Sequence, residues 1–314
     1  MKKIFEVFFS GYTEICEMED GYFYPQRFSS ELRAFLEGIK YKRCNCSAGI
    51  IIKADKCNKI KFDYRTYDGL GFAEFDVLNK STSRTERFSF ANSEGTFEIN
   101  GNEEDIEIYL GYQNMFAFKN IIIDATPAEK PKNTILCYGD SITHGYHCQY
   151  SSEIFPAVLG RNFDAEVYNF GIGGIHSRRE IIDNIENYDK PLFITYEYGT
   201  NDWNYEKDTK DAIKSLFKDL NQIYPDVPVF VILPLPRRTQ NVVKNYGTLM
   251  DFREWIHNEA IQFENYVILD YFNDFDVDIH FAPDGIHPNN DGEHMLSTYI
   301  LSDIKSALKK GKCQ

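Results

Sequence analysis

The sequence predicts an all-β sandwich, jelly-roll-like, over residues 1–125, followed by an α/β domain with a parallel five-stranded sheet over residues 133–314. Three observations lead to this expectation. Apolar residues alternate with period two in the first part, and strand and helix patterns alternate in the second. Two prolines and mixed charges interrupt the pattern in ATPAEKPKN, residues 125–133. With 314 residues, of which 43% are hydrophobic, the chain is long enough to bury two cores.

Short alternating runs characterise the first part. The stretch 59–66 alternates Ile60, Phe62 and Tyr64, and the stretches 73–79 and 105–110 alternate in the same way. Each run predicts a strand with one buried face. Turn signals such as NSEG and NGNEE fall between the runs, at the spacing of an antiparallel sandwich.

Five apolar runs in the second part predict buried strands, and three amphipathic patterns predict helices between or after them. The strands are expected at 133–138, 165–170, 191–198, 228–234 and 265–270. The helices are marked by Ile213 to Ile223, Leu249 to Phe263 and Leu296 to Leu308. This alternation is typical of a parallel sheet covered on both faces. Ligands of such sheets bind beyond the carboxyl ends of the strands.

Composition excludes several function classes. A net charge of −14 and a pI near 5.0 disfavour a nucleic-acid partner. The longest apolar run, residues 227–236, is too short to span a bilayer, and the N-terminus lacks a signal-peptide pattern, so we expect a protein that does not bind membranes. Seven cysteines without regular spacing suit a reducing, cytoplasmic environment. Cys44 and Cys46 have no partner pair, so no metal is expected.

Ser141 lies in CYGDSITHGY, residues 137–146, where an apolar run ends. A serine needs a base within hydrogen-bond reach, and that base needs an orienting partner. Asp284 and His287 are three residues apart, a spacing that stacks two side chains in a helical turn. We therefore expect Asp284 to hold one ring nitrogen of His287 and to direct the other at Ser141. Asp140 is expected to brace the loop as a hydrogen-bond acceptor.

An attacked ester carbonyl develops an oxyanion, which needs preorganised donors. The backbone N–H of Ser141 is one candidate. The glycines of YNFGIGGIHS, residues 168–177, allow close approach of the main chain, and Gly174 offers a second N–H. Asn201 follows another strand and carries an amide donor. These groups lie on different loops that the parallel sheet delivers to one edge.

The segments GDSIT, NFGIGG, GTND and DGIHP, in this order, resemble the four blocks of the GDSL or SGNH hydrolases, a superfamily of esterases and lipases. The resemblance covers about residues 133–310 and implies a three-layer, flavodoxin-like α/β fold that needs no cofactor. It implies a catalytic triad of Ser141, Asp284 and His287. It also implies an oxyanion hole formed by Ser141, Gly174 and Asn201.

Block two departs from the family pattern, because Ile175 and His176 follow the glycines where many relatives have an acid. This leaves Gly173 as an alternative to Gly174. The sandwich before the hydrolase domain is similar to the two-domain carbohydrate esterases that deacetylate sugars. That architecture implies a serine esterase that takes short acyl groups, acetyl above all, from an oligosaccharide or small-molecule ester.

Trp203, Tyr146 and His176 follow the site motifs closely and are candidate substrate-binding residues, with packing as the alternative for the aromatic pair. A lysophospholipase or acyl-thioesterase is a second enzyme hypothesis. A carbohydrate-binding protein with a vestigial hydrolase domain is a third reading, and an acyltransferase would use the same residues. The sequence does not identify the sugar, the acylated position or the oligomeric state.

Overall fold

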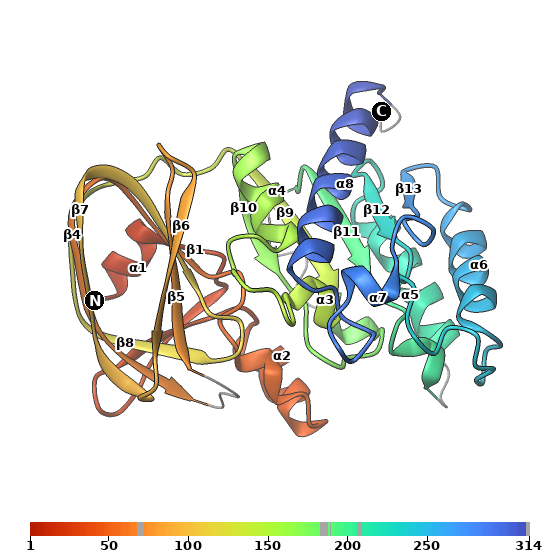
Figure 1. Cartoon of the computed structure of the whole chain (residues 1–314), viewed down its shortest axis with the longest axis horizontal. Coiled ribbons are helices and arrows are strands. Elements are labelled where there is room, and N and C mark those ends of the chain that lie inside the picture. The colour runs from red at the N-terminus through yellow and green to blue at the C-terminus, as the bar shows by residue number, and fades with distance from the viewer. Residues whose placement is uncertain (68–71, 183–187, 189, 206–208, 312–314) are drawn as a thin grey trace. The chain divides into compact units, whose positions relative to one another are not determined.

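The computed structural model describes residues 1–67, 72–182, 188, 190–205 and 209–311 (Figure 1). The chain divides into two compact units. The first contains residues 1–132 with 150–152 and 166–168, and the second contains the other residues from 133 onward. Among the described helices, none has the length and apolar character needed to cross a bilayer.

An antiparallel sheet of eight strands dominates the first unit, in the order β2-β3-β8-β4-β7-β5-β6, with β1 paired to β4. Its strands are β1 Phe9–Ser10, β2 Glu14–Glu17, β3 Phe23–Gln26, β4 Ile51–Tyr67, β5 Ala73–Asn79, β6 Arg84–Phe90, β7 Glu94–Leu110 and β8 Met115–Pro127. The unit also contains two short helices that the alternating pattern did not predict, α1 Lys2–Phe8 and α2 Ser30–Gly38.

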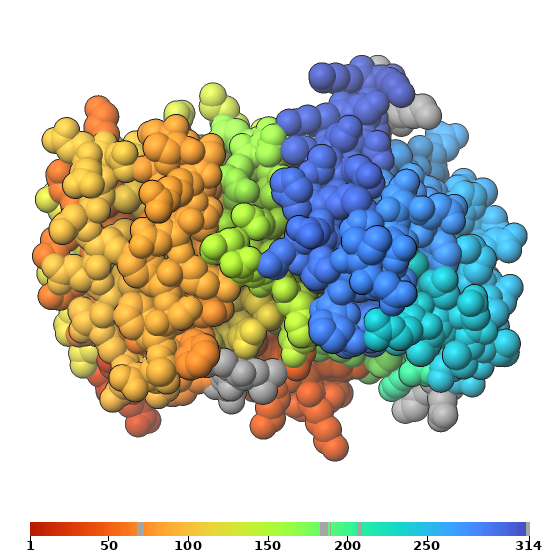
Figure 2. Space-filling view, viewed as in Figure 1, coloured from red at the N-terminus to blue at the C-terminus, as the bar shows by residue number. Residues whose placement is uncertain are grey.

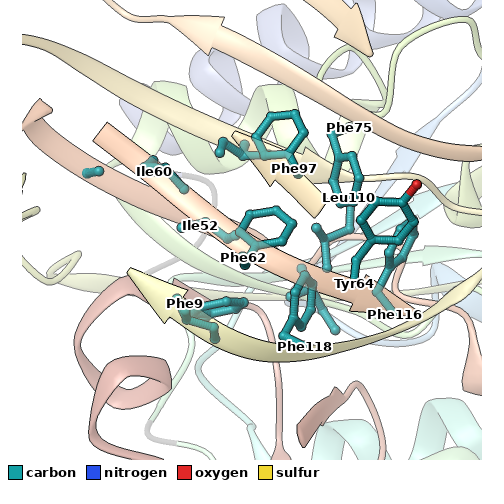
Figure 3. Close-up of a cluster of buried hydrophobic side chains, with 14 of the residues drawn as sticks. Phe9, Ile52, Ile60, Phe62, Tyr64, Phe75, Phe97, Leu110, Phe116 and Phe118 are labelled. Carbon is teal, nitrogen blue, oxygen red and sulfur yellow. The ribbon is translucent and has the colours of Figure 1, made fainter. Parts of the chain in front are cut away.

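The sheet curves around an aromatic core (Figure 3). The ring centroids of Phe75 on β5 and Phe116 on β8 are 5.0 Å apart. Strands β7 and β4 lie between β5 and β8 in the sheet order. A flat sheet would hold β5 and β8 roughly 14 Å apart, because neighbouring strands are about 4.8 Å apart. Contact between the two rings therefore requires the sheet to fold over on itself, which gives the sandwich that the sequence predicts.

Strand β4 is longer than the run predicted at 59–66. Its register on β7 shifts between Ala54 and Cys57 and again between Cys57 and Lys59. Such a bulge breaks the alternation of buried and exposed side chains. Lys56, with a φ of 48°, lies inside this bulge. The period-two pattern was therefore readable only beyond it.

The second unit contains the predicted five-stranded parallel sheet, in the order β10-β9-β11-β12-β13. Its strands are β9 Asn133–Gly139, β10 Ala165–Asn169, β11 Phe193–Glu197, β12 Val229–Ile232 and β13 Tyr266–Leu269. The first strand, β9, therefore lies between the second, β10, and the third, β11. This is the flavodoxin-like order. In such sheets ligands bind beyond the carboxyl ends of the strands, at the point between the first and third strands where the strand order reverses.

Helices cover both faces of this sheet. They are α3 Ser141–His144, α4 Phe155–Phe163, α5 Thr209–Ile223, α6 Leu249–Ala260, α7 Val277–His280 and α8 Asn290–Lys309. The connection from β9 to β10 runs towards one edge of the sheet, whereas those from β11 to β12 and β13 run towards the other edge. Because such connections are right-handed, α4 covers one face of the sheet, and α5 and α6 cover the other. Figure 1 shows α4 beside α8, where Glu293 accepts a hydrogen bond from the N–H of Phe155 at 3.1 Å. The predicted helices correspond to α5, α6 and α8.

Two distant segments meet at the carboxyl edge of the parallel sheet. The segment after α3 lies against the segment that leads into α8, and Figure 2 shows them as adjoining green and blue surfaces. The side chain of Asn290 links the two, because it accepts from the N–H of Gln149 at 2.8 Å and donates to the Gln149 side chain at 2.7 Å.

Candidate active site

Ser141 begins helix α3 directly after β9, which lies between β10 and β11 in the sheet. Asp140 is the N-cap of this helix, and its side chain accepts a hydrogen bond from the N–H of Ile142 at 3.1 Å. The Ser141 side chain is almost buried, with 5% exposure. The first N–H groups of a helix have no carbonyl partner within it. In this short turn the N–H groups of Ile142 and Thr143 are instead taken up by the side chains of Asp140 and Glu197.

His287 connects Ser141 to Asp284. The Nε2 atom of His287 lies 2.7 Å from Oγ of Ser141. The Nδ1 atom of the same ring lies 2.7 Å from Oδ2 of Asp284. The histidine can therefore donate from Nδ1 to the carboxylate and accept from the serine hydroxyl at Nε2, which is the arrangement that activates a serine for attack.

A turn of the backbone fixes Asp284 in its ionised form. Partial burial acts to raise the pKa of Asp284, but hydrogen bonds from the His287 ring and from the N–H groups of Ile286 and His287 lower it to about 2. Those N–H groups donate to Oδ1 at 2.9 and 3.1 Å. The sequence predicted a helical turn here. The structure instead has an aspartate-capped turn with Gly285 at a φ of 64°, and α8 begins later, at Asn290.

Gly174 and Gly173 have different surroundings in the loop after β10. The N–H of Gly173 donates to Nδ1 of His144 at 3.1 Å. Gly174 is exposed, with a φ of 78° and open space where a Cβ would lie. The N–H of Gly173 is thus engaged with α3, which favours Gly174 as the oxyanion donor of this loop.

Gly171 explains how this loop approaches helix α3. A Cβ at Gly171 would lie 2.4 Å from the backbone nitrogen of His144, so any side chain would separate the loop from α3. The Nδ2 atom of Asn169 adds a hydrogen bond to the carbonyl of Thr143 at 2.9 Å. The loop can therefore contact Ser141–His144 closely only because residue 171 has no side chain.

Asn201 lies just after β11 and joins the other two loops. Its Nδ2 atom donates to Oδ2 of Asp140 at 3.2 Å and to the carbonyl of Ile175 at 3.1 Å. Asp140 precedes Ser141 and Ile175 follows Gly174. One amide therefore links the three segments from which the sequence predicted oxyanion donors, although both of its hydrogens are engaged in this structure.

Buried carboxyl groups lie beneath these loops. Burial raises the pKa of Asp140 to about 7 and that of Asp202 to about 7. Burial and the neighbouring Asp140 also raise the pKa of Glu197 well above its ordinary value. Oε2 of Glu197 accepts from the N–H of Thr143 at 3.2 Å and from its hydroxyl at 2.9 Å. Both pKa shifts oppose the presence of two adjacent negative charges beneath α3.

The three candidate substrate-binding residues have different surroundings. The ring of Tyr146 lies beside that of His287, with centroids 5.0 Å apart, and so borders the site. The half-buried His176 stacks on Tyr205 at 3.8 Å, and burial lowers its pKa to about 4, so the ring is neutral at neutral pH. Trp203 is wholly buried and donates from Nε1 to the carbonyl of Gly247 at 2.9 Å. Its indole is therefore part of the packing and offers no face to a sugar.

The sequence analysis did not single out two residues of this region. His147 has its Nε2 atom 3.3 Å from Oδ2 of Asp284. Arg237 donates to the carbonyl of Thr200 at 3.0 Å. Burial lowers the pKa of Arg237, and the negative charges of Asp140 and Asp284 oppose this effect. Proximity to the GDSIT motif was the only available signal for His147, and for Arg237 the only signal was its place after a predicted strand.

A serine beside an oriented histidine, at the carboxyl edge of a parallel sheet, defines the class of α/β serine hydrolases. The GDSL-like lipase/acylhydrolase family matches residues 137–295, which is more than half of the chain. The chain belongs to this family and is a hydrolase that acts on esters. Comparison with curated proteins gives no match.

Solved structures share the fold over most or nearly all of this chain. A salicylyl-acyltransferase, SsfX3, from a tetracycline biosynthetic pathway has a TM-score of 0.79 and 16% identity, over 98% of this chain and 96% of that one. A family two carbohydrate esterase from Clostridium thermocellum, in complex with cellohexaose, has a TM-score of 0.65 and 17% identity, over 84% and 94%. A family two carbohydrate esterase from Cellvibrio japonicus has a TM-score of 0.65 and 12% identity, over 96% of each chain. At these identities the likeness establishes the fold.

Proposed function

We propose that this protein is a serine esterase that hydrolyses short acyl esters, acetyl esters above all, on a carbohydrate. The observation that carries this proposal is the pair of contacts at His287, 2.7 Å to the Ser141 hydroxyl and 2.7 Å to the Asp284 carboxylate. Its likeness in fold to carbohydrate esterases, over both units of the chain, supports the choice of substrate class.

In the first half of the reaction, Oγ of Ser141 attacks the ester carbonyl while Nε2 of His287 takes the hydroxyl proton. The ionised Asp284 stabilises the resulting imidazolium through Nδ1. The N–H groups of Ser141 and Gly174 and the amide of Asn201 surround the oxyanion. Asn201 exchanges its bond to the Ile175 carbonyl for the oxyanion and keeps its bond to Asp140. Collapse of the tetrahedral intermediate breaks the bond between the acyl carbon and the sugar oxygen, and that oxygen takes the proton from His287 as it leaves.

In the second half, water attacks the acyl-enzyme. His287 takes a proton from this water and returns it to Oγ of Ser141 when the carboxylic acid leaves. The cycle consumes one ester and one water and yields one acid and one alcohol, so no external co-reactant is needed.

The test compares p-nitrophenyl acetate, butyrate and octanoate, with an acetylated xylo-oligosaccharide alongside. We expect acetate to be the best substrate, free acetate to appear from the sugar, and Ser141→Ala to abolish both activities. Preference for octanoate would favour a lysophospholipase or thioesterase. An inert wild type that binds glycan would favour a carbohydrate-binding protein.

Acyl transfer to an alcohol is the second candidate function. Its basis is the similarity to a salicylyl-acyltransferase, which extends over 98% of this chain. The same Ser141 and His287 would serve, with a sugar hydroxyl in place of the second-step water. Mass analysis of products formed with an alcohol acceptor distinguishes the two, because transfer yields a new ester and hydrolysis yields only free acid.

A further inference from the structure

His147 shares an acceptor with the proposed base. Its Nε2 atom lies 3.3 Å from Oδ2 of Asp284, the oxygen that also accepts from His287. The His147 side chain is 44% exposed and that of Asp284 is 33% exposed, so solutes reach this side of the cluster. His147 has a φ of 67°, a left-handed conformation that non-glycine residues adopt rarely.

Tyr146 holds the two imidazoles near each other. The Tyr146 ring contacts that of His147 edge-on, with centroids 5.1 Å apart, and that of His287 at 5.0 Å. The two histidine rings are themselves 5.4 Å apart. Two imidazoles and one carboxylate therefore converge from segments that lie far apart in the sequence.

The geometry of this cluster is close to that of a zinc site. One possible ligand atom from each of His147, Asp284 and His287 lies within 4.8 Å of the other two. Tetrahedral zinc with bonds of about 2.0 to 2.2 Å holds its ligands about 3.3 to 3.5 Å apart. The distance between His147 Nε2 and Asp284 Oδ2 already has this value, at 3.3 Å. The His287 Nδ1 contact, now 2.7 Å, needs to lengthen by roughly 0.6 Å.

We propose that His147, Asp284 and His287 form an inhibitory site for a divalent transition metal of the zinc class. Two imidazole nitrogens and one carboxylate oxygen suit zinc, and water fills the fourth position. Magnesium and calcium prefer oxygen ligands alone, so we expect them to bind here much more weakly than zinc. The binding site itself does not depend on the reaction, whereas its inhibitory effect rests on the proposed function.

Inhibition follows from the tautomer of His287. Catalysis requires the proton on Nδ1, where it bonds to Asp284, and a free lone pair on Nε2. A metal on Nδ1 displaces that proton, and the neutral ring then carries it on Nε2. An N–H at Nε2 cannot accept the hydroxyl proton of Ser141. Zinc also occupies Asp284 Oδ2, which removes the partner of the imidazolium.

The first arm of the test measures zinc binding without activity, by competition with a chromophoric chelator in a thiol-free reductant. Ser141→Ala is the host, and His147→Ala and His294→Ala are added to it separately. His294 is an exposed residue of α8 and serves as the matched control. Loss of a residue that only supports a metal ligand weakens affinity by about 10 to 100-fold, so loss of a ligand should cost at least about tenfold. We expect one zinc per chain, affinity lowered at least that far by His147→Ala, and no effect of His294→Ala.

The second arm measures ester hydrolysis by otherwise wild-type enzyme at rising zinc concentration. We expect half of the activity to be lost at the zinc concentration that half-saturates the site, and EDTA to restore the activity. His147→Ala should need a zinc concentration at least about tenfold higher for the same inhibition. Zinc affinity that is the same with and without His147 overturns the site. Binding that depends on His147 but leaves hydrolysis intact retains the site and overturns its inhibitory role. An enzyme inert towards all esters refutes the proposed function and leaves the first arm as the test of the site.

Discussion

Replacement of Asp284 by asparagine tests how the proposed base is oriented. The asparagine side chain retains an oxygen for the N–H groups of Ile286 and His287, which now donate to Oδ1 of Asp284 at 2.9 and 3.1 Å. Its amide NH2 replaces the oxygen that lies 2.7 Å from Nδ1 of His287. The turn is therefore preserved, whereas the partner of the imidazole changes from an acceptor to a donor.

The expected loss follows from that exchange. A donor opposite Nδ1 favours the tautomer with its proton on Nε2, and this tautomer cannot accept a proton from Ser141. In serine hydrolases the equivalent exchange lowers kcat by roughly 10⁴-fold. That loss corresponds to about 5.5 kcal/mol at about 1.4 kcal/mol per tenfold change in rate. We expect Asp284→Asn to lose about 10³ to 10⁴-fold in kcat on p-nitrophenyl acetate, with KM changed by no more than about threefold.

Asp291→Asn is the matched control, because Asp291 is an exposed carboxylate in the first turn of α8. It should retain full activity within about twofold, since it has no part in the site. Circular dichroism and thermal unfolding establish that both variants are folded. If folded Asp284→Asn retains more than about one tenth of the wild-type kcat, the reasoning about the tautomer is wrong.

Three further predictions concern the supports of the site and the sandwich. Gly171→Ala places a Cβ 2.4 Å from the backbone nitrogen of His144, whereas Gly38→Ala meets nothing within 4 Å. The first should lower the free energy of unfolding by about 1 to 3 kcal/mol and reduce hydrolysis, and the second should do neither, as measured by urea unfolding and kcat. Asp202 has its pKa raised by burial to about 7, so the folded state binds its proton more tightly than the unfolded state does. Its contribution to the free energy of unfolding is therefore present below about pH 4 and is lost as pH rises towards 7. The wild-type free energy of unfolding should fall between about pH 4.5 and pH 8, and Asp202→Asn should reduce this fall by up to about 4 kcal/mol. An unchanged slope would contradict the burial argument. Phe75→Ala should lower the stability of the first unit by roughly 3 to 5 kcal/mol in urea unfolding, because the Phe75 ring is fully buried in the aromatic core, and a loss below about 1 kcal/mol would show that this core is not tightly packed.

The parallel sheet was predictable because its evidence is local. Each buried strand is a continuous apolar run, and each amphipathic helix repeats every three to four residues, so the alternation of elements can be recognised one segment at a time. The same holds for the pairing of Asp284 with His287, which are three residues apart. The helices α1 to α4 and α7 were missed because short helices give few periods to recognise.

The long strands of the first unit were recognised only in part. In β7 the alternation is readable at 105–110 but not before it, where Asn102 and Glu103 both have positive φ values. A bulge inserts a residue and moves the following side chains to the opposite face. Sequence periodicity therefore recovers the segments between irregularities, whereas strand length is decided by pairing with the neighbouring strand.

The sequence by itself determined the five strands of the parallel sheet and the helices α5, α6 and α8, together with the nucleophile candidate and its partners, because residue type, spacing and strand ends are all local properties. Only the tertiary structure decided which groups converge. It brings His147 to Asp284, links Asn201 to Asp140, and buries Trp203, which the sequence left open as a substrate surface. These outcomes depend on the strand order and on the paths of separate loops. Contacts between residues many positions apart are set by how whole elements pack, and no local pattern encodes that packing.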